Sequence, residues 1–219
     1  MSLNTRDGTK IYTPLSLKLY DWWVLAVSNR YAWRCDTHNV LLPHFSQHIG
    51  ANHLDIGVGT GFYPKMIRNQ IEQISFVDLN QHSLSYARKS IGDTKIQQCV
   101  QHDIFNPFPK NMHETFDSIS IFYLLHCLPG TLRDKQTAIR HVVAALKPDG
   151  VLYGATILGA GVSHNAFGRK LMQVYNKKGI FSNYHDSLAS LQEVLSTFFV
   201  DVTIKVEGVV AIFSAKHKV

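Results

Sequence analysis

An apolar strand runs into a loop with glycine at every second position in the stretch His53-Leu54-Asp55-Ile56-Gly57-Val58-Gly59-Thr60-Gly61-Phe62. A helix-like segment, Tyr63 to Gln70, follows it. Glycine tolerates positive φ and has no Cβ, so such a loop turns sharply and lets a ligand lie against bare backbone. The start of the helix behind it offers unpaired N–H groups. The stretch therefore predicts a site for a nucleotide-type cofactor.

The spacing of the glycines excludes two common sites of this kind. A dinucleotide loop reads G-x-G-x-x-G, whereas here Gly57, Gly59 and Gly61 are followed by Phe62 where the third glycine would fall. A P-loop needs a Lys-Ser/Thr pair, which is missing. Asp55 stands two residues before the first glycine. A carboxylate there suits a positive amino or sulfonium group better than a pyrophosphate.

Further apolar segments lead to acids. Ile74 to Asp78 and Ile96 to Asp103 each end in aspartate, and Phe116 to His126 is a fourth candidate strand. A carboxylate in the position of Asp78 can accept both ribose hydroxyls of an adenosine. Strand-end caps are the alternative interpretation of these acids. Ala145 to Gly150 is expected to close a helix before a fifth strand, Val151 to Leu158.

Taken together, these segments resemble a known family. Leu54 to Gly61, Val77-Asp78, His102-Asp103, Phe116-Asp117 and Leu146-Lys147-Pro148-Asp149-Gly150 are similar to the class I S-adenosylmethionine (SAM)-dependent methyltransferases of small-molecule type. The resemblance covers about residues 52–158 strongly. It implies an α/β, Rossmann-like, seven-stranded and mostly parallel sheet with the last strand antiparallel and helices on both faces. Asp149 stands where glycine is commoner.

The resemblance also implies a cofactor, SAM with product S-adenosylhomocysteine, and a set of residues that bind it. In the family's terms the methionine end is held by Asp55 and the loop glycines, the ribose by Asp78 and the adenine amino group by Asp103. The full set of expected cofactor-binding residues is Asp55, Gly57, Gly59, Gly61, Asp78, Leu79, Asp103, Ile104 and Phe122.

Composition indicates one globular domain. The 219 residues are 45% hydrophobic and 17% charged, with a net charge of +6 that is scattered rather than gathered in a stripe, which disfavours nucleic acid. Cys35, Cys99 and Cys127 show no C-x-x-C pair and suggest buried thiols in a reducing cytosol. Because no leader or membrane span is apparent, we expect a cytoplasmic protein.

Residues 1–51 are expected to form an N-terminal helical lid or cap, and residues 52–219 the SAM-binding core. Tyr20, Trp22, Trp23, Tyr31 and Trp33 make the first part unusually aromatic. The tryptophans suit core packing, whereas Tyr20 and Tyr31, about three helical turns apart, are candidates to contact substrate. A second helix, about His38 to His48, should lead into the first strand.

The acceptor side is expected beyond the fourth and fifth strands. His126 follows the fourth strand, where it either acts as a general base for the incoming nucleophile or only orients a loop. Residues 160–186 are predicted as an insertion whose amphipathic helix, Asn165 to Lys178, helps to build the acceptor pocket, with a dimer contact as the alternative. Tyr175 and Tyr184 are the further substrate candidates. The histidines show no metal-ligand spacing, so no metal is expected.

The other helices are predicted from caps and apolar stripes. Asn80 should cap one helix, and Asp134 should open another that runs to Leu146. After a helix from Ser187 to Thr197, the strands Phe199 to Val206 and Val209 to Lys216 should form a hairpin.

The sequence thus predicts an enzyme that transfers a methyl group from SAM to a small-molecule acceptor, as a monomer or homodimer, with the attacking atom left open. A methyltransferase of RNA or protein, and a catalytically silent SAM-binding partner subunit, are the alternatives. The sulfonium methyl of SAM is already electrophilic, so the protein's task is to align the acceptor and exclude water.

Overall fold

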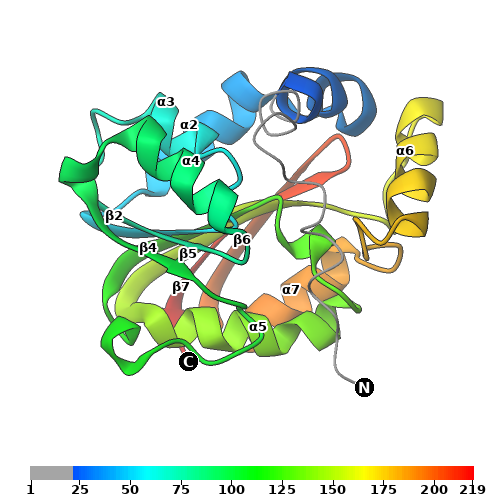
Figure 1. Ribbon diagram of the computed structural model, residues 1–219. Helices are drawn as coiled ribbons and strands as arrows, with labels where there is room; N and C mark the ends of the chain where they lie inside the picture. The colour runs from blue at the N-terminus through cyan, green and yellow to red at the C-terminus, as the bar shows by residue number, and fades with distance from the viewer. Residues whose placement is uncertain (1–21) are drawn as a thin grey trace.

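The computed structural model describes residues 22–219, with side chains from Val27 onward, as a seven-stranded sheet between helices (Figure 1). The strand order is β3-β2-β1-β4-β5-β7-β6. The seventh strand is antiparallel to both of its neighbours, and the other pairings are parallel. The predicted fold class is therefore confirmed.

In chain order the elements are η2 (Trp22–Trp33), η3 (Thr37–Leu41), α2 (Leu42–His48), β1 (Asn52–Ile56), α3 (Phe62–Met66), β2 (Gln73–Asp78), α4 (Gln81–Ile91), η4 (Asp93–Lys95), β3 (Ile96–Gln101), η5 (Lys110–Met112), β4 (Phe116–Phe122), η6 (Leu125–Cys127), α5 (Leu132–Ala145), β5 (Leu146–Ile157), α6 (Ala166–Lys177), α7 (Leu188–Ser196), β6 (Phe199–Glu207) and β7 (Val210–Lys218).

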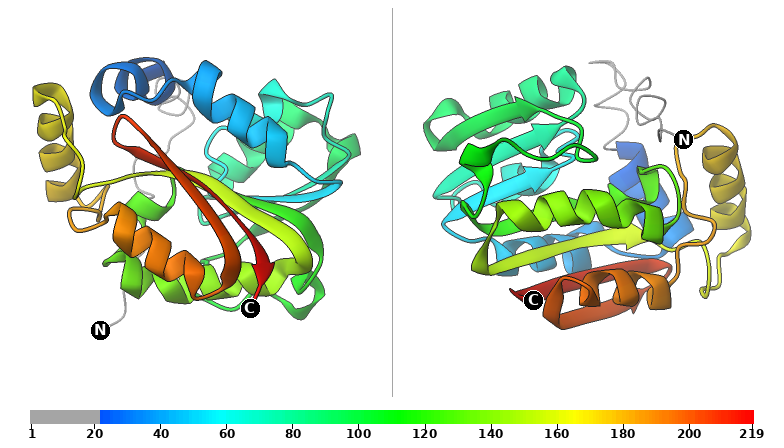
Figure 2. Two further views of the ribbon diagram at one scale, coloured as in Figure 1. Left: turned by 180° about the vertical axis from the view of Figure 1, so that it is seen from behind. Right: turned by 90° about the horizontal axis from the view of Figure 1, so that it is seen from below.

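Helices cover both faces of the sheet. The helices α2, α3 and α4 lie on one face, and α5 and α7 lie on the other (Figures 1 and 2). The central strands β1 and β4 are buried along most of their length, including polar residues, because helices cover both faces. Leu54 and Ile56 of β1 pack in the cluster that contains α5 and α7 residues, whereas Phe76 of β2 packs with α4 in the other cluster. The strands therefore form the middle layer of a three-layer domain.

The strand order reverses between β1 and β4. The chain moves outward from β1 through β2 to β3, then returns to the other side of β1 with β4 and β5. In open α/β sheets the crevice at this switch point, beyond the carboxyl ends of the strands, is where ligands bind. The glycine loop leaves β1 at this point, and Phe122 ends β4 beside it.

Polar side chains cap the first turns of α4 and α5. The prediction that Asn80 caps α4 is confirmed, because its side-chain oxygen accepts the N–H of His82 at 2.8 Å. For α5 the predicted opening residue is wrong by three positions. Thr131 is the cap, and Asp134 completes a capping box by accepting the N–H of Thr131 at 2.8 Å. Leu146, expected to end this helix, already pairs with Phe116 at the start of β5.

Two further predicted helices differ in extent. The segment expected as one helix from His38 to His48 is divided into the π-helical η3 and the α-helical α2, with Pro43 at the start of α2. Proline lacks an N–H, so the hydrogen-bond ladder cannot continue through it. The helix after the glycine loop ends at Met66 instead of Gln70, and the chain then turns toward β2.

The inserted helix α6 stands beyond the carboxyl end of β5, apart from the sheet (Figure 2). Asn165 caps it by accepting the N–H of Gly168 at 2.7 Å. The same side chain donates to the carbonyl of Tyr31 at 2.7 Å, and Arg34 donates to the carbonyl of Ser163. These contacts join the end of η2 to the start of α6, so the two segments expected on the acceptor side lie against each other.

The secondary structure predicted after residue 186 is confirmed. The helix α7 and the β6–β7 hairpin fall within two residues of the expected bounds. None of the helices in residues 22–219 combines the length and the apolar character needed to cross a bilayer.

Candidate cofactor site and acceptor side

The three loop glycines all have positive φ, of 73°, 54° and 69° for Gly57, Gly59 and Gly61. The three glycines differ in the space around them. A Cβ on Gly57 would meet Leu124 at 3.0 Å, and one on Gly61 would meet the Cβ of Ala87 at 2.9 Å, whereas one on Gly59 would meet nothing within 4 Å. A side chain at Gly61 would clash with Ala87, and one at Gly57 would press against Leu124. Gly59 is the glycine that exposes bare backbone to open space.

Asp78 lies directly beside this loop. Its carboxylate accepts the N–H of Asn80 at 2.8 Å and the N–H of Gly59 at 3.4 Å. Burial raises the pKa of the Asp78 carboxyl to about 6, although the same backbone N–H groups act to lower it. The carboxylate is therefore fixed at the end of β2 against the glycine loop, with its acceptor atoms partly in use.

Asp55 is almost completely buried, with 5% of its surface exposed. Ser120 of β4 donates its hydroxyl to Asp55 Oδ1 at 2.5 Å. Burial raises the pKa of the Asp55 carboxyl to about 7, the Ser120 hydrogen bond lowers it, and the nearby charge of Asp78 raises it. Two carboxyls that influence each other thus stand where β1 and β2 end.

Asp103 lies two residues beyond the end of β3, the strand next to β2. Its side chain accepts the N–H of Phe105 at 3.0 Å. Ile104 is buried, and Leu79, between β2 and α4, is half-buried. Since β1, β2 and β3 are neighbours and run in the same direction, Asp55, Asp78 and Asp103 are brought to one edge of the sheet.

Phe122 closes β4 on the other side of the loop. It is buried, with its ring 4.7 Å from the ring of Tyr63 and 5.3 Å from that of Phe45. The next residue, Tyr123, has a φ of 55°, an uncommon value for a tyrosine, and its N–H bonds to the carbonyl of Ala155 at 2.8 Å. The chain therefore bends sharply as it leaves β4, at the switch point.

This edge has the donors and acceptors that suit SAM. Gly59 offers a surface without a side chain, Asp78 offers a carboxylate for ribose hydroxyls, and Asp55 offers negative charge for an ammonium or sulfonium group. A pyrophosphate would instead meet two carboxyls. The described residues thus fit SAM by the chemistry of their side chains.

Comparisons with known proteins agree with this chemistry. The family model described as a methyltransferase domain matches residues 54–152. A protein of Escherichia coli K12 called YbcY is 54% identical over 89% of this chain and 100% of its own length. The physcion biosynthesis cluster O-methyltransferase of Aspergillus chevalieri is 42% identical over 96% of this chain and 95% of its own. The chain belongs to the SAM-dependent methyltransferases.

Solved structures share the fold of this methyltransferase. The N-methyltransferase NodS of Bradyrhizobium japonicum, solved with S-adenosylhomocysteine, has a TM-score of 0.59 at 16% identity and covers 81% of this chain and 84% of its own. The citrinin polyketide synthase CMeT domain has a TM-score of 0.66 at 13% identity, over 97% of this chain and 60% of its own. The enzyme uses SAM as its cofactor and methylates a small-molecule acceptor.

His126 of the methyltransferase is buried in η6, with 2% of its surface exposed. Its Nδ1 accepts the N–H of Ile157 at 3.3 Å and lies 3.4 Å from the hydroxyl of Thr156. Burial, with the nearby Lys135 cation, lowers the pKa of the His126 ring to about 3. The ring is therefore neutral, with its proton on Nε2 and its only lone pair directed at the backbone.

The tyrosines predicted for the acceptor side are dispersed. Tyr31, at the end of η2, is 59% exposed, and Tyr184, in the loop after α6, is 47% exposed. Tyr175 on α6 is half-buried, with its ring 4.9 Å from that of Phe181, which in turn lies 4.5 Å from the ring of His126. Tyr20 lies outside the described residues. The structure therefore links Tyr175 and His126 through Phe181, but not Tyr31 or Tyr184.

A buried ion pair fixes the loop that carries Phe181. Lys135 of α5 and Asp186 are 2.6 Å apart, with side chains 0% and 1% exposed, and Lys135 also donates to the carbonyl of Ser182 at 2.7 Å. The sequence analysis did not single out this pair. The available signal was a lysine on the buried stripe of an amphipathic helix, which requires a partner.

The three cysteines are free, and burial raises the pKa of the Cys35 and Cys127 thiols to about 12. Cys35 is buried as expected, but Cys99 and Cys127 are only half-buried. Within residues 22–219, no group of three or more His, Cys, Asp or Glu side chains is arranged to hold a metal ion.

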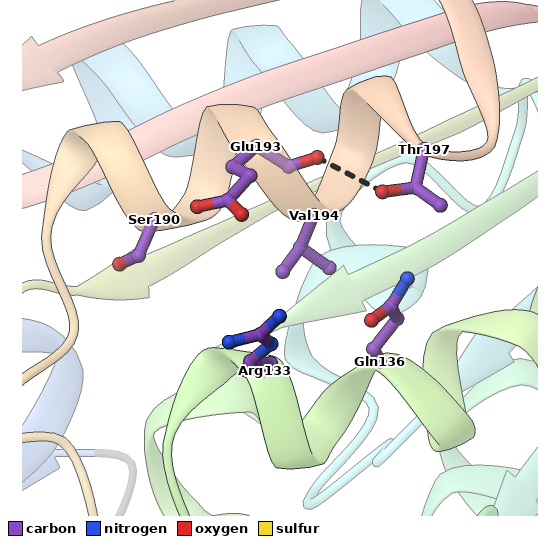
Figure 3. Close-up of a pocket in the computed structure, with 6 residues that line it drawn as sticks. All are labelled: Arg133, Gln136, Ser190, Glu193, Val194 and Thr197. Carbon is purple, nitrogen blue, oxygen red and sulfur yellow. Dashed lines mark hydrogen bonds between the residues drawn. The ribbon is translucent and has the colours of Figure 1, made fainter.

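A shallow groove between α5 and α7 lies outside the predicted site (Figure 3). It holds about 220 Å³, which is smaller than most sites for small organic ligands, and none of the predicted site residues lines it. Its lining residues are Arg133, Gln136, Ser190, Glu193, Val194 and Thr197.

Proposed function

We propose that this methyltransferase is an O-methyltransferase, which places the methyl group on a hydroxyl oxygen of its acceptor. The observation that carries the proposal is whole-length similarity to O-methyltransferases. Besides the Aspergillus chevalieri protein, the demethylluteothin O-methyltransferase of Streptomyces thioluteus is 34% identical over 95% of this chain. These matches extend well beyond the cofactor domain, into the segments that distinguish one acceptor from another.

We assign the cofactor contacts as the sequence predicts them. Asp78 accepts the ribose hydroxyls, Asp103 and Ile104 receive the adenine, and Asp55 with the Gly59 backbone holds the methionine end. Leu79 and Phe122 complete the apolar walls. When bound, SAM supplies a methyl group that is already activated on sulfonium. The protein then has to position the acceptor oxygen and keep water out.

The acceptor hydroxyl must lose its proton, and we propose that His126 does not take it. A neutral ring whose Nδ1 already accepts the Ile157 N–H has no lone pair left for a second proton donor. His126 instead supports Phe181, which packs edge-on against it. An acceptor hydroxyl of phenol or enol acidity fits this arrangement, because it ionises without a strong base.

We propose that residues 1–51 act as a lid over the acceptor, together with the segment 160–186. The support is the joint between η2 and α6, in which Asn165 and Arg34 bond to carbonyls across the two segments. Tyr20, Tyr31, Tyr175 and Tyr184 are the proposed acceptor-side tyrosines. A phenol suits this role because it both stacks and forms hydrogen bonds.

We also propose that the enzyme acts without nucleic acid, as a monomer or homodimer in the cytoplasm. The scattered positive charge disfavours a nucleic-acid surface. Free cysteines with weakly acidic thiols suit a reducing compartment.

The test of O-methyl transfer is a product analysis. Purified enzyme is incubated with isotopically labelled SAM and matched aromatic acceptors that carry a hydroxyl, an amine, a thiol or an activated carbon. We expect a methoxy carbon in the NMR spectrum of the product from the hydroxyl series. Turnover confined to amines, thiols or carbon would overturn the assignment while leaving the family membership intact.

A further inference from the structure

A chain of hydrogen bonds runs through the buried middle of the sheet and ends on Asp55. The N–H of Gly50 reaches Ser118 Oγ at 2.7 Å, and Ser118 Oγ lies 2.7 Å from His53 Nδ1. His53 Nε2 lies 3.0 Å from Ser120 Oγ, which is 2.5 Å from Asp55 Oδ1. His53 pairs with Ser118, and Asp55 with Ser120, across β1 and β4. All four side chains therefore point to the same face of the sheet.

The carboxylate end sets the direction of the hydrogen bonds. Ser120 gives its one hydroxyl proton to Asp55 Oδ1, so toward His53 its oxygen can only accept, and it accepts the proton on Nε2. The neutral ring then has its lone pair on Nδ1, which accepts the hydroxyl proton of Ser118, and Ser118 Oγ accepts the N–H of Gly50. Each bond in this series therefore points its positive end toward the carboxylate.

This chain of hydrogen bonds is shielded from water. His53, Ser118 and Ser120 are each 0% exposed. The ring of Phe45 packs edge-on against His53 at 5.6 Å, and the ring of Tyr153 lies 5.8 Å away. In such surroundings aligned hydrogen bonds act strongly on a charge because little water screens them.

We propose that Ser118, His53 and Ser120 are a positioning relay that keeps the Asp55 carboxylate ionised and correctly turned for the bound cofactor. None of the three touches the cofactor in this proposal, and all act through Asp55. The inference rests on the proposed role of Asp55 at the methionine end. It explains why a histidine and two serines occupy the apolar centre of the sheet, where aliphatic residues would pack at lower cost.

Other titratable groups around Asp55 are few. Asp78 faces it from the end of β2 and disfavours its ionisation. Tyr153 faces it from β5, where it pairs with Ser120; its phenol is kept neutral by burial, and its hydroxyl interacts with the Ser120 hydroxyl. His44 and His48 of α2 pack against Tyr153, and Asp55 is not among their partners. Burial lowers the pKa of His53 to about 3, so this ring stays neutral at every pH used below.

The test compares the affinity for S-adenosylhomocysteine of wild type and Ser120→Ala, measured by calorimetry from about pH 6 to 9.5. Loss of a hydrogen bond to a carboxylate should raise the pKa of Asp55 by roughly one to two units. The ratio of variant to wild-type Kd cancels the titration of the ligand itself. It should be roughly 5- to 50-fold at pH 7 and should close toward 1 near pH 9.5.

Three further variants complete the design. Ser75→Ala is the matched control, because Ser75 is a fully buried serine in the strand on the other side of β1, with a hydroxyl outside the relay. Its Kd ratio should stay near 1 at each pH. His53→Gln keeps an amide donor for Ser120 and should retain more affinity at pH 7 than His53→Leu.

A second measurement needs no ligand. The ¹⁵N shifts of the His53 ring should show a proton on Nε2 and none on Nδ1, unchanged from about pH 8 to 5. A Kd ratio for Ser120→Ala that does not vary with pH, or a ring protonated on Nδ1, would overturn the relay. If wild type itself fails to bind the cofactor product, the assignment of the site has failed, not the relay alone.

Discussion

Asp55→Asn should make the unliganded protein more stable, although it removes a charge that the cofactor needs. The pKa of the Asp55 carboxyl rises from 3.8 to about 7 on folding, mainly through burial. The folded protein therefore holds a proton that the unfolded chain has already released between about pH 4 and 7, so its stability falls as the pH rises through this window. Asparagine cannot ionise and does not incur this loss.

The size of the effect follows from the same pKa values. At about 1.4 kcal/mol per pH unit, ionising Asp55 in the folded protein costs at most about 4 kcal/mol above pH 7. About 2–3 kcal/mol of this develops between pH 5 and 8. For a domain of this size, the Tm advantage of Asp55→Asn should grow by roughly 5–10 °C over that interval.

The assay is thermal unfolding of the unliganded protein at several pH values, followed by circular dichroism. Asp149→Asn is the control, since Asp149 is exposed at the start of β5 and its replacement removes one carboxylate without touching the buried edge of the sheet. The reasoning is refuted if Asp55→Asn is less stable than wild type at pH 8, or if its advantage does not grow with pH.

Three other predictions concern neighbouring parts of the site. Asp78→Ala should stay folded but weaken SAM binding by roughly 100-fold in calorimetry, because two hydroxyls lose a charged acceptor; an unchanged Kd would remove the ribose assignment. Gly61→Ala should lower the Tm more than Gly59→Ala, because both positions have positive φ but only the Cβ at Gly61 would also lie 2.9 Å from that of Ala87. Gly59→Ala should weaken SAM binding as well; a larger loss of Tm for Gly59→Ala would contradict the loop geometry. Lys135→Met should lower the free energy of unfolding by about 3–5 kcal/mol in denaturant titrations, because it leaves the buried Asp186 carboxylate unpaired. The double variant Lys135→Met/Asp186→Asn should recover a large part of this loss. An equal loss in the single and the double variant would show that the unpaired carboxylate is not the cause.

The sequence was sufficient for the parts of the structure that repeat a local pattern. Each apolar run that ended in an acid became a parallel strand, and adjacency in the sheet then brought Asp55, Asp78 and Asp103 to one edge. The open setting of Gly59 could not be read in this way. What separates it from Gly57 and Gly61 is that Leu124 and Ala87, from distant parts of the sequence, lie close to those two glycines.

The relay to Asp55 was beyond reach of the sequence for a similar reason. His53 and Asp55 are two residues apart in one strand, which indicates a shared face, but the partner of each, Ser118 or Ser120, lies 65 residues further along the sequence. Only the register of β1 against β4 makes them neighbours. The possible base role of His126 was equally undetermined, because burial and the Ile157 N–H, rather than residue type, set its protonation.

The most direct measurement of the central claim is a crystal structure of the protein with S-adenosylhomocysteine. The account predicts the ribose hydroxyls on Asp78, the amino end beside Asp55 and the Gly59 backbone, and the adenine next to Asp103 and Ile104. Density for the ligand away from the carboxyl ends of β1, β2 and β3, or a ribose that leaves Asp78 untouched, would contradict it.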